Sequence, residues 1–215
     1  MIGEIFAFFT TLDVQLTTLA QNSPYLFYGV LATIIFVEAG IVLFPILPGD
    51  SMLFVAGAIV ALAGLNLHGL VALLIAAAII GNSLNYALGR YFGERAFGHG
   101  ANKNSRIFKP IYLERTRAFY DKYGPTSIIL ARFVPIVRTF VPFLAGVAPM
   151  RYPIFLINNI IGGVLWIASL VYAGYWFGNV PWVKKNLSLL VIAIVLVSVL
   201  PVAIKVLQEW RGARK

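Results

Sequence analysis

Residues 44–50 read Phe-Pro-Ile-Leu-Pro-Gly-Asp, and residues 131–139 read Ala-Arg-Phe-Val-Pro-Ile-Val-Arg-Thr. Each stretch interrupts a longer apolar segment, residues 44–65 and 126–150. Proline lacks a backbone N–H and glycine weakens a helix, so neither segment can continue as one helix. We therefore predict two broken helical hairpins. Their breaks are expected at Pro45, Pro48, Gly49, Pro135 and Pro142.

Composition places these hairpins in a membrane. Of the 215 residues, 60% are hydrophobic and 12% are charged, whereas a soluble domain averages roughly 45–50% and 25%. This excludes disorder and argues against a soluble enzyme. The net charge of +9 comes from 17 Lys and Arg against 8 Asp and Glu. Because the basic residues lie between apolar runs, they indicate membrane topology rather than nucleic-acid binding.

Metal and thiol chemistry have no candidate residues. The chain has no cysteine, and its two histidines, His68 and His99, belong to no ligand-spaced cluster. No nucleophile with an adjacent base is evident either. We expect no cofactor, no metal and no enzymatic activity.

Four segments are long enough to span a bilayer, which needs about 20 apolar residues. They are residues 24–44, 68–92, 153–178 and 186–207. Residues 3–20 carry an apolar stripe at helical spacing but also Glu4, Asp13 and Gln15. This segment is read as an amphipathic interfacial helix, and a cap helix packed on the bundle is an equal alternative.

An internal repeat relates the two halves. Ala56-Gly57-Ala58 recurs as Ala145-Gly146-Val147, and residues 86–93 recur as 172–178 with one residue fewer. A re-entrant hairpin returns to the side it left and one span then crosses, so the second unit is inverted. The predicted fold is an all-α polytopic membrane protein, an inverted repeat of re-entrant broken hairpin plus transmembrane helix, with an N-terminal amphipathic helix. Close helix packing is expected at Gly89, Gly93, Gly174 and Gly178.

Five regions follow from this pattern. They are an interfacial helix (1–22), a first repeat of span, hairpin and span (23–93), a basic cytoplasmic linker with an amphipathic helix (94–124), a second repeat of hairpin and span (125–180), and a last transmembrane helix with a basic tail (181–215). The linker and the tail are expected in the cytoplasm, because positive charge is enriched there. Both termini are then cytoplasmic.

Four charges remain inside apolar sequence: Glu38, Asp50, Arg132 and Arg138. Each costs about 2.5–3.5 kcal/mol at a helix centre on translocon scales. They must therefore face protein or a wet cavity, and inverted repeats would bring them together near the midplane. They could form a structural ion-pair cluster, with Glu38 and Arg132 as an exchangeable pair. They could instead form a transport site, in which Arg132 and Arg138 bind a phosphate and Glu38 and Asp50 carry protons, since burial favours a neutral carboxyl group.

The quoted motifs, together with Phe36-Val37-Glu38 and Gly81-Asn82 through Arg90, resemble the DedA family, also called SNARE-associated or VTT-domain proteins. The likeness covers about residues 20–180. Asn82 departs from it, because many relatives carry an aspartate there. The resemblance implies a multi-pass protein of the bacterial inner (cytoplasmic) membrane that supports envelope homeostasis and depends on the proton gradient. It also implies lipid transport, of undecaprenyl phosphate in some members and phosphatidylethanolamine in others. Its functional acids and arginines correspond to Glu38, Asp50, Arg132 and Arg138.

Residues and resemblance together predict a proton-motive-force-linked flippase that returns undecaprenyl phosphate across the inner membrane. A phosphatidylethanolamine or general phospholipid flippase or scramblase is the first alternative. A small-ion/proton antiporter is the second, and a structural or assembly factor stays open. The expected partners are a membrane lipid and protons, with no nucleic acid. Homo-oligomer formation is left open.

Overall fold

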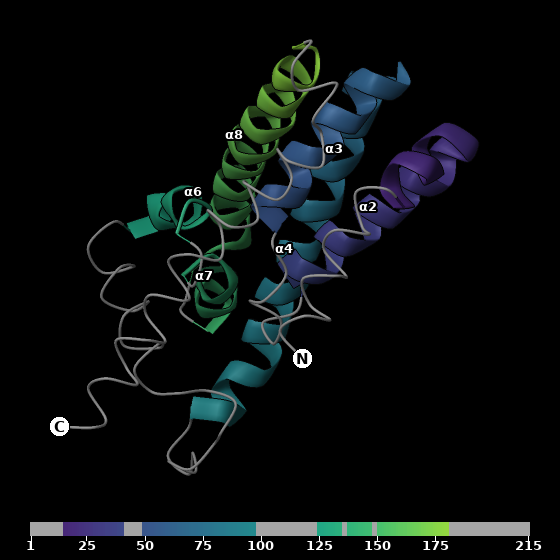
Figure 1. Ribbon diagram of the computed structural model, residues 1–215. Helices are drawn as coiled ribbons and strands as arrows, with labels where there is room; N and C mark the ends of the chain where they lie inside the picture. The colour runs from purple at the N-terminus through teal and green to yellow at the C-terminus, as the bar shows by residue number, and fades with distance from the viewer. Residues whose placement is uncertain (1–14, 41–48, 98–123, 135–136, 148–149, 181–215) are drawn as a thin grey trace, which may run out of the picture. The chain divides into compact units, whose positions relative to one another are not determined.

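The computed structural model describes residues 15–40, 49–97, 124–134, 137–147 and 150–180, with the side chains of residues 92–97 excepted. Every regular element in these ranges is a helix (Figure 1). Residues 15–22 are helical. The other helices are α2 (Pro24–Gly40), α3 (Gly49–Ala63), α4 (Leu67–Phe97), the 3-10 turn η1 (Gly124–Thr126), α6 (Ser127–Ala131), α7 (Val137–Val147) and α8 (Tyr152–Gly178). The all-helical prediction is confirmed for this part of the chain.

Two helices are long and apolar enough to cross a membrane. Leu67–Tyr91 of α4 has a mean hydropathy of 2.0 and Tyr152–Gly178 of α8 one of 2.1. They correspond to the predicted spans 68–92 and 153–178. The third predicted span, 24–44, forms α2, whose 17 residues are shorter than a typical span. The fourth, 186–207, and most of the predicted N-terminal helix lie outside the described residues.

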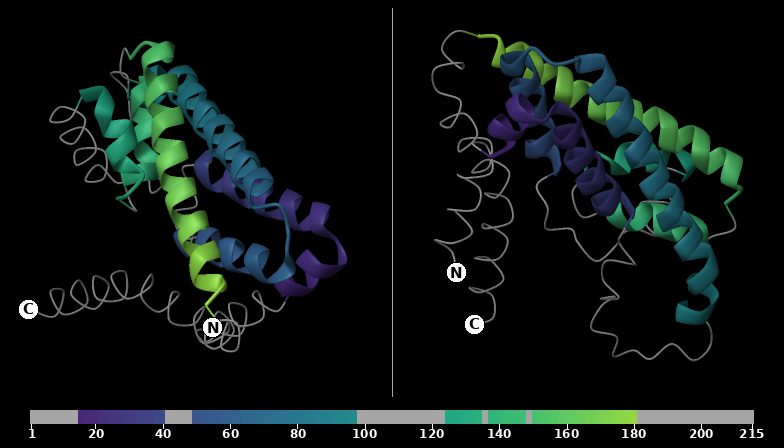
Figure 2. Two further views of the ribbon diagram at one scale, coloured as in Figure 1. Left: turned by 90° about the horizontal axis from the view of Figure 1, so that it is seen from above. Right: turned by 90° about the vertical axis from the view of Figure 1, so that its right-hand side faces the viewer.

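The second predicted break is present between α6 and α7. Arg132, Phe133 and Val134 donate their backbone N–H groups to the carbonyls three residues earlier, at 2.9–3.3 Å. The backbone therefore stays hydrogen-bonded where the α-helix stops. The two short helices pack against each other (Figure 1), and α6 also contacts α8 (Figure 2), where Gly162 faces Ile129.

The prediction of a break at Pro142 is wrong, because Pro142 lies inside α7. An internal proline removes the hydrogen bond to the carbonyl four residues earlier and crowds that carbonyl, which can kink a helix without ending it. The first hairpin is described from Gly49, where α3 begins. Pro45, Pro48 and Pro135 lie outside the described residues.

The chain divides into two compact units. The first comprises residues 1–29, 48–68 and 169–215, and the second comprises residues 30–47 and 69–168. In the second unit an apolar cluster joins α4, α6, α7 and α8 and so fixes the broken hairpin. Its members are Tyr86, Ile128, Ala131, Val141, Ala145, Met150 and Phe155.

Each unit contains a close helix crossing built on two glycines. In the first unit α3 meets α8: a Cβ on Gly57 would collide with the carbonyl oxygen of Val171, and one on Gly174 with that of Phe54. In the second unit α7 meets α4 in the same way, through Gly146 and Gly89. The predicted role in close helix packing is confirmed for Gly89, Gly174 and Gly178. Gly93 lies among residues 92–97, whose surroundings the structure does not describe.

The two crossings are equivalent contact by contact. A shift of 85 residues carries α4 onto α8, and a shift of 89 carries α3 onto α7. Under these shifts the contacting residues correspond as follows: Tyr86 with Val171, Gly89 with Gly174, Arg90 with Tyr175, Phe54 with Phe143, and Gly57 with Gly146. Each crossing therefore joins the hairpin helix of one sequence repeat to the long helix of the other.

Candidate functional site

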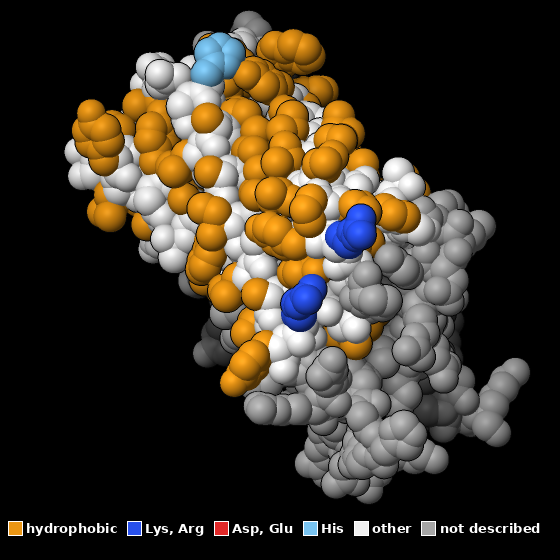
Figure 3. All heavy atoms as spheres, turned by 180° about the vertical axis from the view of Figure 1, so that it is seen from behind, with side chains coloured by type: hydrophobic (Ala, Val, Ile, Leu, Met, Phe, Trp, Pro, Cys, Tyr) orange, Lys and Arg blue, Asp and Glu red, His pale blue; other side chains and the backbone are white. Residues whose placement is uncertain are grey.

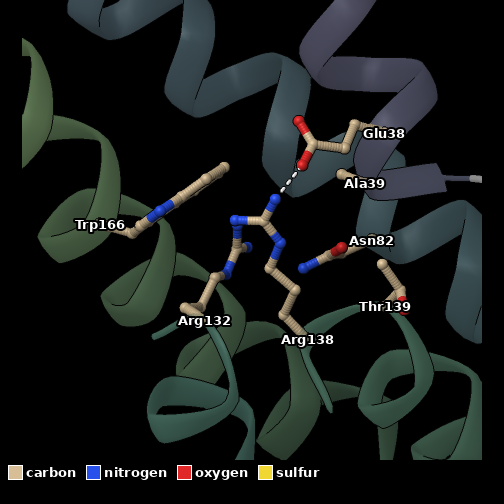
Figure 4. Close-up of a pocket in the computed structure, with 7 residues that line it drawn as sticks. All are labelled: Glu38, Ala39, Asn82, Arg132, Arg138, Thr139 and Trp166. Carbon is tan, nitrogen blue, oxygen red and sulfur yellow. Dashed lines mark hydrogen bonds and ion pairs between the residues drawn. The ribbon is translucent and has the colours of Figure 1, made fainter. Parts of the chain in front are cut away.

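The candidate site lies in the second unit, where α2, α4, α8 and the α6–α7 break converge (Figure 4). Glu38 comes from the end of α2, Arg132 follows α6, and Arg138 lies in the first turn of α7. The two arginines are six positions apart in the sequence. Because the chain turns between them, both guanidinium groups reach the same cavity. They line a cavity of about 20 Å³ together with Ala39, Asn82, Thr139 and Trp166.

Glu38 and Arg138 form a buried ion pair. Nη2 of Arg138 donates to Oε1 of Glu38 (Figure 4). Their side chains are 5% and 13% exposed, respectively. The contact joins the end of α2 to the first turn of α7, and breaking it would leave a largely buried charge without its partner. The predicted exchangeable pair, Glu38 with Arg132, is corrected: the carboxylate bonds to Arg138.

Arg132 is held by neutral amides. Its Nη2 donates to Oδ1 of Asn159 at 2.6 Å. Asn159 is fully buried. Its Nδ2 donates to the carbonyl of Ile79 at 3.1 Å, and this hydrogen bond fixes the orientation of the amide. No described residue accepts a hydrogen bond from Nε of Arg132. The guanidinium is therefore positioned by carbonyl oxygens, which are neutral acceptors.

The oxygen and nitrogen of the Asn82 amide can be assigned in two ways, related by a half-turn. In one, Nδ2 donates to Oδ1 of Asn159 at 3.0 Å. In the other, Nδ2 donates to the carbonyl of Ala39 at 3.0 Å and Oδ1 accepts from Nη2 of Arg132 at 2.8 Å. The second satisfies donor and acceptor alike and keeps two N–H donors from facing each other, so we adopt it. Two carbonyl oxygens then converge on Arg132.

Trp166 faces both arginines from α8. Its ring centre is 5.5 Å from the guanidinium carbon of Arg132 and 5.2 Å from that of Arg138. Cation–π attraction to an indole face stabilises a guanidinium by about 0.5–2 kcal/mol. One ring thus offsets part of the repulsion between two neighbouring cations.

Two guanidinium groups and one carboxylate line the cavity in this unit, and their formal charges sum to 2 − 1 = +1. Glu38 supplies the only acidic side chain that the structure describes in this unit. An uncompensated buried charge is expensive, and an anion would neutralise it. The cavity, however, has room for about one water molecule and is too small for a phosphate in this conformation.

The predicted fourth member, Asp50, belongs to the other unit. It lies in the first turn of α3. A carboxylate there interacts favourably with the positive end of the helix dipole. The structure therefore brings three of the four predicted charges together and leaves the placement of Asp50 relative to them undescribed.

Sequence reasoning missed the polar frame around the charges. Asn85 is fully buried and donates Nδ2 to the carbonyls of Ala39 (3.3 Å) and Thr139 (3.0 Å). With Asn82 and Asn159 it ties α4 to α2, α7 and α8. The signal was available, because three amides within apolar helices are unusual and a buried amide needs hydrogen-bond partners.

Comparison with known proteins places the site in a family context. Residues 47–176 match the VTT domain. The chain is 47% identical over 217 residues to protein DedA of Escherichia coli, covering 100% of this chain and 98% of that protein. It is 44% identical to an uncharacterised membrane protein of Mycobacterium tuberculosis over 84% of this chain and 79% of that one. It is 31% identical to inner membrane protein YghB of E. coli over 74% and 71%. No solved structure matches.

Proposed function

Because the chain belongs to the DedA family of VTT-domain membrane proteins, we propose that it is a lipid transporter linked to the proton-motive force. The proposed substrate is undecaprenyl phosphate, returned across the bacterial inner membrane. The proposed topology has two re-entrant hairpins in inverted repeats and both termini in the cytoplasm. Protons and the membrane lipid are its partners, and it performs no enzymatic reaction.

The observation that carries this proposal is the meeting of two largely buried guanidinium groups, Arg132 and Arg138, in one cavity. Guanidinium groups bind phosphate oxygens bidentately and stay charged at any relevant pH. Both arginines are largely buried, and attraction for an anion is stronger there than in water. The prenyl tail would remain in the bilayer, so no aqueous pore is needed.

The unlike surroundings of the two arginines suggest unlike roles. Arg132 is held by the amide oxygens of Asn159 and Asn82 and acts as the fixed cation. Arg138 is bonded to Glu38 and acts as the exchangeable one. Protonation of Glu38 weakens that bond and frees the guanidinium of Arg138 to turn to the phosphate. When the lipid leaves, Glu38 loses its proton and binds Arg138 again, which links lipid movement to proton movement.

The cavity volume supports a second candidate, a small-ion/proton antiporter. About 20 Å³ admits a water molecule or a small ion, whereas a phosphate would require the α6–α7 break to open. An antiporter predicts cation-dependent proton flux in liposomes that contain neither undecaprenyl phosphate nor phosphatidylethanolamine. The lipid transporter predicts no such flux.

The deciding experiment is transport in proteoliposomes, with undecaprenyl phosphate and phosphatidylethanolamine tested side by side and with or without a pH gradient. We expect the wild type to move undecaprenyl phosphate faster under the gradient. Arg132→Ala should lose movement, and Glu38→Gln should lose the response to the gradient. Arg151→Ala, which removes an exposed arginine, is the matched control. The proposal fails if folded wild type moves neither lipid faster than empty liposomes do.

A further inference from the structure

A second, open groove lies on the outer side of α4, away from the charge cluster. It has a volume of about 830 Å³ and is lined by Ser83, Tyr86, Ala87, Arg90, Tyr91 and Tyr152. No acidic side chain is among these lining residues. Neither the predicted site nor the transport proposal uses this groove.

We propose that the groove binds the phosphate of an anionic membrane phospholipid, with one acyl chain lying along α4. This inference does not rest on lipid transport, because it concerns a headgroup held at the membrane surface. The cation is Arg90. Its guanidinium is exposed, and its polar contact with a described residue is a long one, 3.5 Å from Nη1 to the hydroxyl of Tyr86. Among the residues whose side chains are described, its other N–H groups meet no acceptor, and a guanidinium can bind a phosphate through two of them.

The walls of the groove suit a headgroup at a membrane interface. Tyr91 and Tyr152 are 64% and 42% exposed, and tyrosine is enriched at the level of lipid headgroups. Tyr152 donates its hydroxyl proton to Oγ of Ser83 at 3.3 Å, which places two hydroxyl groups beside the space. Tyr152 is also the first residue of α8, so the positive end of that helix dipole faces the same side.

A stripe of exposed apolar residues leads into the groove along α4. Successive members are three or four residues apart, which places them on one helix face. They are Leu73, Ala76, Ile80, Leu84 and Ala87. Ten residues separate Ile80 from Arg90, about 15 Å at the helical rise. A soluble anion would have no use for this stripe, whereas an acyl chain would cover it. The apolar character of the exposed surface is visible in Figure 3, where cationic side chains are few and no acidic ones appear.

The two glycine crossings differ at the position of Arg90, which lines the groove. Arg90 occupies the position that Tyr175 occupies in the other crossing. The fold therefore does not require a cation at this position. Helix packing therefore does not account for the cation at Arg90, and phosphate binding in the groove would give it a role.

The test is lipid binding to the full-length protein, followed by native mass spectrometry. Delipidated protein is titrated with phosphatidylglycerol, with phosphatidylcholine of the same acyl chains, and with inorganic phosphate. Four variants are compared: Arg90→Gln removes the cation, Arg90→Lys keeps the charge without the planar fork, Ala87→Trp fills the groove, and Arg151→Gln removes an exposed arginine that does not line it. Melting temperatures establish which variants are folded.

We expect the wild type to prefer phosphatidylglycerol to phosphatidylcholine. Arg90→Gln should weaken phosphatidylglycerol binding about tenfold, as loss of a charge-assisted hydrogen bond does, and Arg90→Lys should weaken it less. Ala87→Trp should weaken binding with Arg90 intact, while Arg151→Gln changes it less than twofold. Wild-type affinity in Arg90→Gln and Ala87→Trp would overturn the proposal. So would equal loss in Arg151→Gln, which would indicate general surface charge, or displacement by millimolar inorganic phosphate, which would indicate a site for soluble anions.

Discussion

Exchanging the two charges of the Glu38–Arg138 pair separates a structural role from a transport role. We expect the double variant Glu38→Arg, Arg138→Glu to recover stability without recovering transport. The swap restores opposite charges at the two positions where the structure shows a direct contact. It also moves a guanidinium from α7 to α2, away from the face that Arg132 and Arg138 share beside Trp166.

The expected loss of stability depends on how deeply the ion pair is buried and on which contacts the remaining partner keeps. Removing one partner of a buried pair destabilises by about 3–5 kcal/mol. In Glu38→Gln the guanidinium of Arg138 keeps its contact with Trp166 at 5.2 Å, so we expect the lower value, about 3 kcal/mol. That corresponds to roughly a hundredfold change in the unfolding equilibrium. The swap should recover at least half of this free energy, because unlike charges again face each other.

Two measurements on the same four proteins decide the matter. The free energy of unfolding is measured in mixed micelles, and lipid movement is measured in proteoliposomes, for the wild type, Glu38→Gln, Arg138→Gln and the swap. A positive coupling energy with transport still absent is the expected outcome. Transport restored to near the wild-type rate by the swap would refute the reasoning, because the pair would then be a structural lock. Absence of any coupling energy would refute the contact itself.

Two further predictions concern the amide that holds Arg132 and the crossing of α4 and α7 at Gly89. Asn159→Ala should destabilise by about 1.5–3 kcal/mol, since it removes the acceptor at 2.6 Å from Arg132, whereas Asn158→Ala, on the exposed side of α8, should change unfolding by less than about 0.5 kcal/mol. Gly89→Ala should destabilise by at least about 1–3 kcal/mol, because the new methyl group would collide with backbone of α7. Gly29→Ala, which meets nothing within 4 Å, should be neutral or stabilising by up to about 1 kcal/mol. Melting curves in detergent check both pairs, and equal shifts within either pair would contradict the assignment.

The helices and the second break could be predicted because their causes are local. Apolar runs of 25 and 27 residues set α4 and α8, and the stretch around Pro135 cannot remain helical. The wrong break at Pro142 came from the same rule, applied where the surrounding helix tolerates a missing hydrogen bond. Prolines thus indicate where a helix can break, and the neighbouring helices decide whether it does.

The partners within the site could not be predicted, because they depend on which faces meet. The inverted repeat predicted that Glu38 and the two arginines lie in one region, and the structure confirms that they meet. The repeat pattern cannot tell which guanidinium faces the carboxylate. The answer depends on the turn after α6, which directs Arg132 toward the amides of α4 and α8 and leaves Arg138 for Glu38.

The side chain at position 82 affects the charge balance of the site, because it lies beside Arg132. An aspartate at this position would place a carboxylate where the amide oxygen lies 2.8 Å from Nη2 of Arg132, and the described cluster would then be neutral. With asparagine, Arg132 is oriented by a neutral acceptor, and in the proposed transporter its charge would be left for the lipid phosphate. Asn82 also leaves Glu38 as the one acidic side chain that the structure describes in this unit. In the proposed transporter the neutral amide would therefore restrict the proton response to the acid that competes with the phosphate for Arg138.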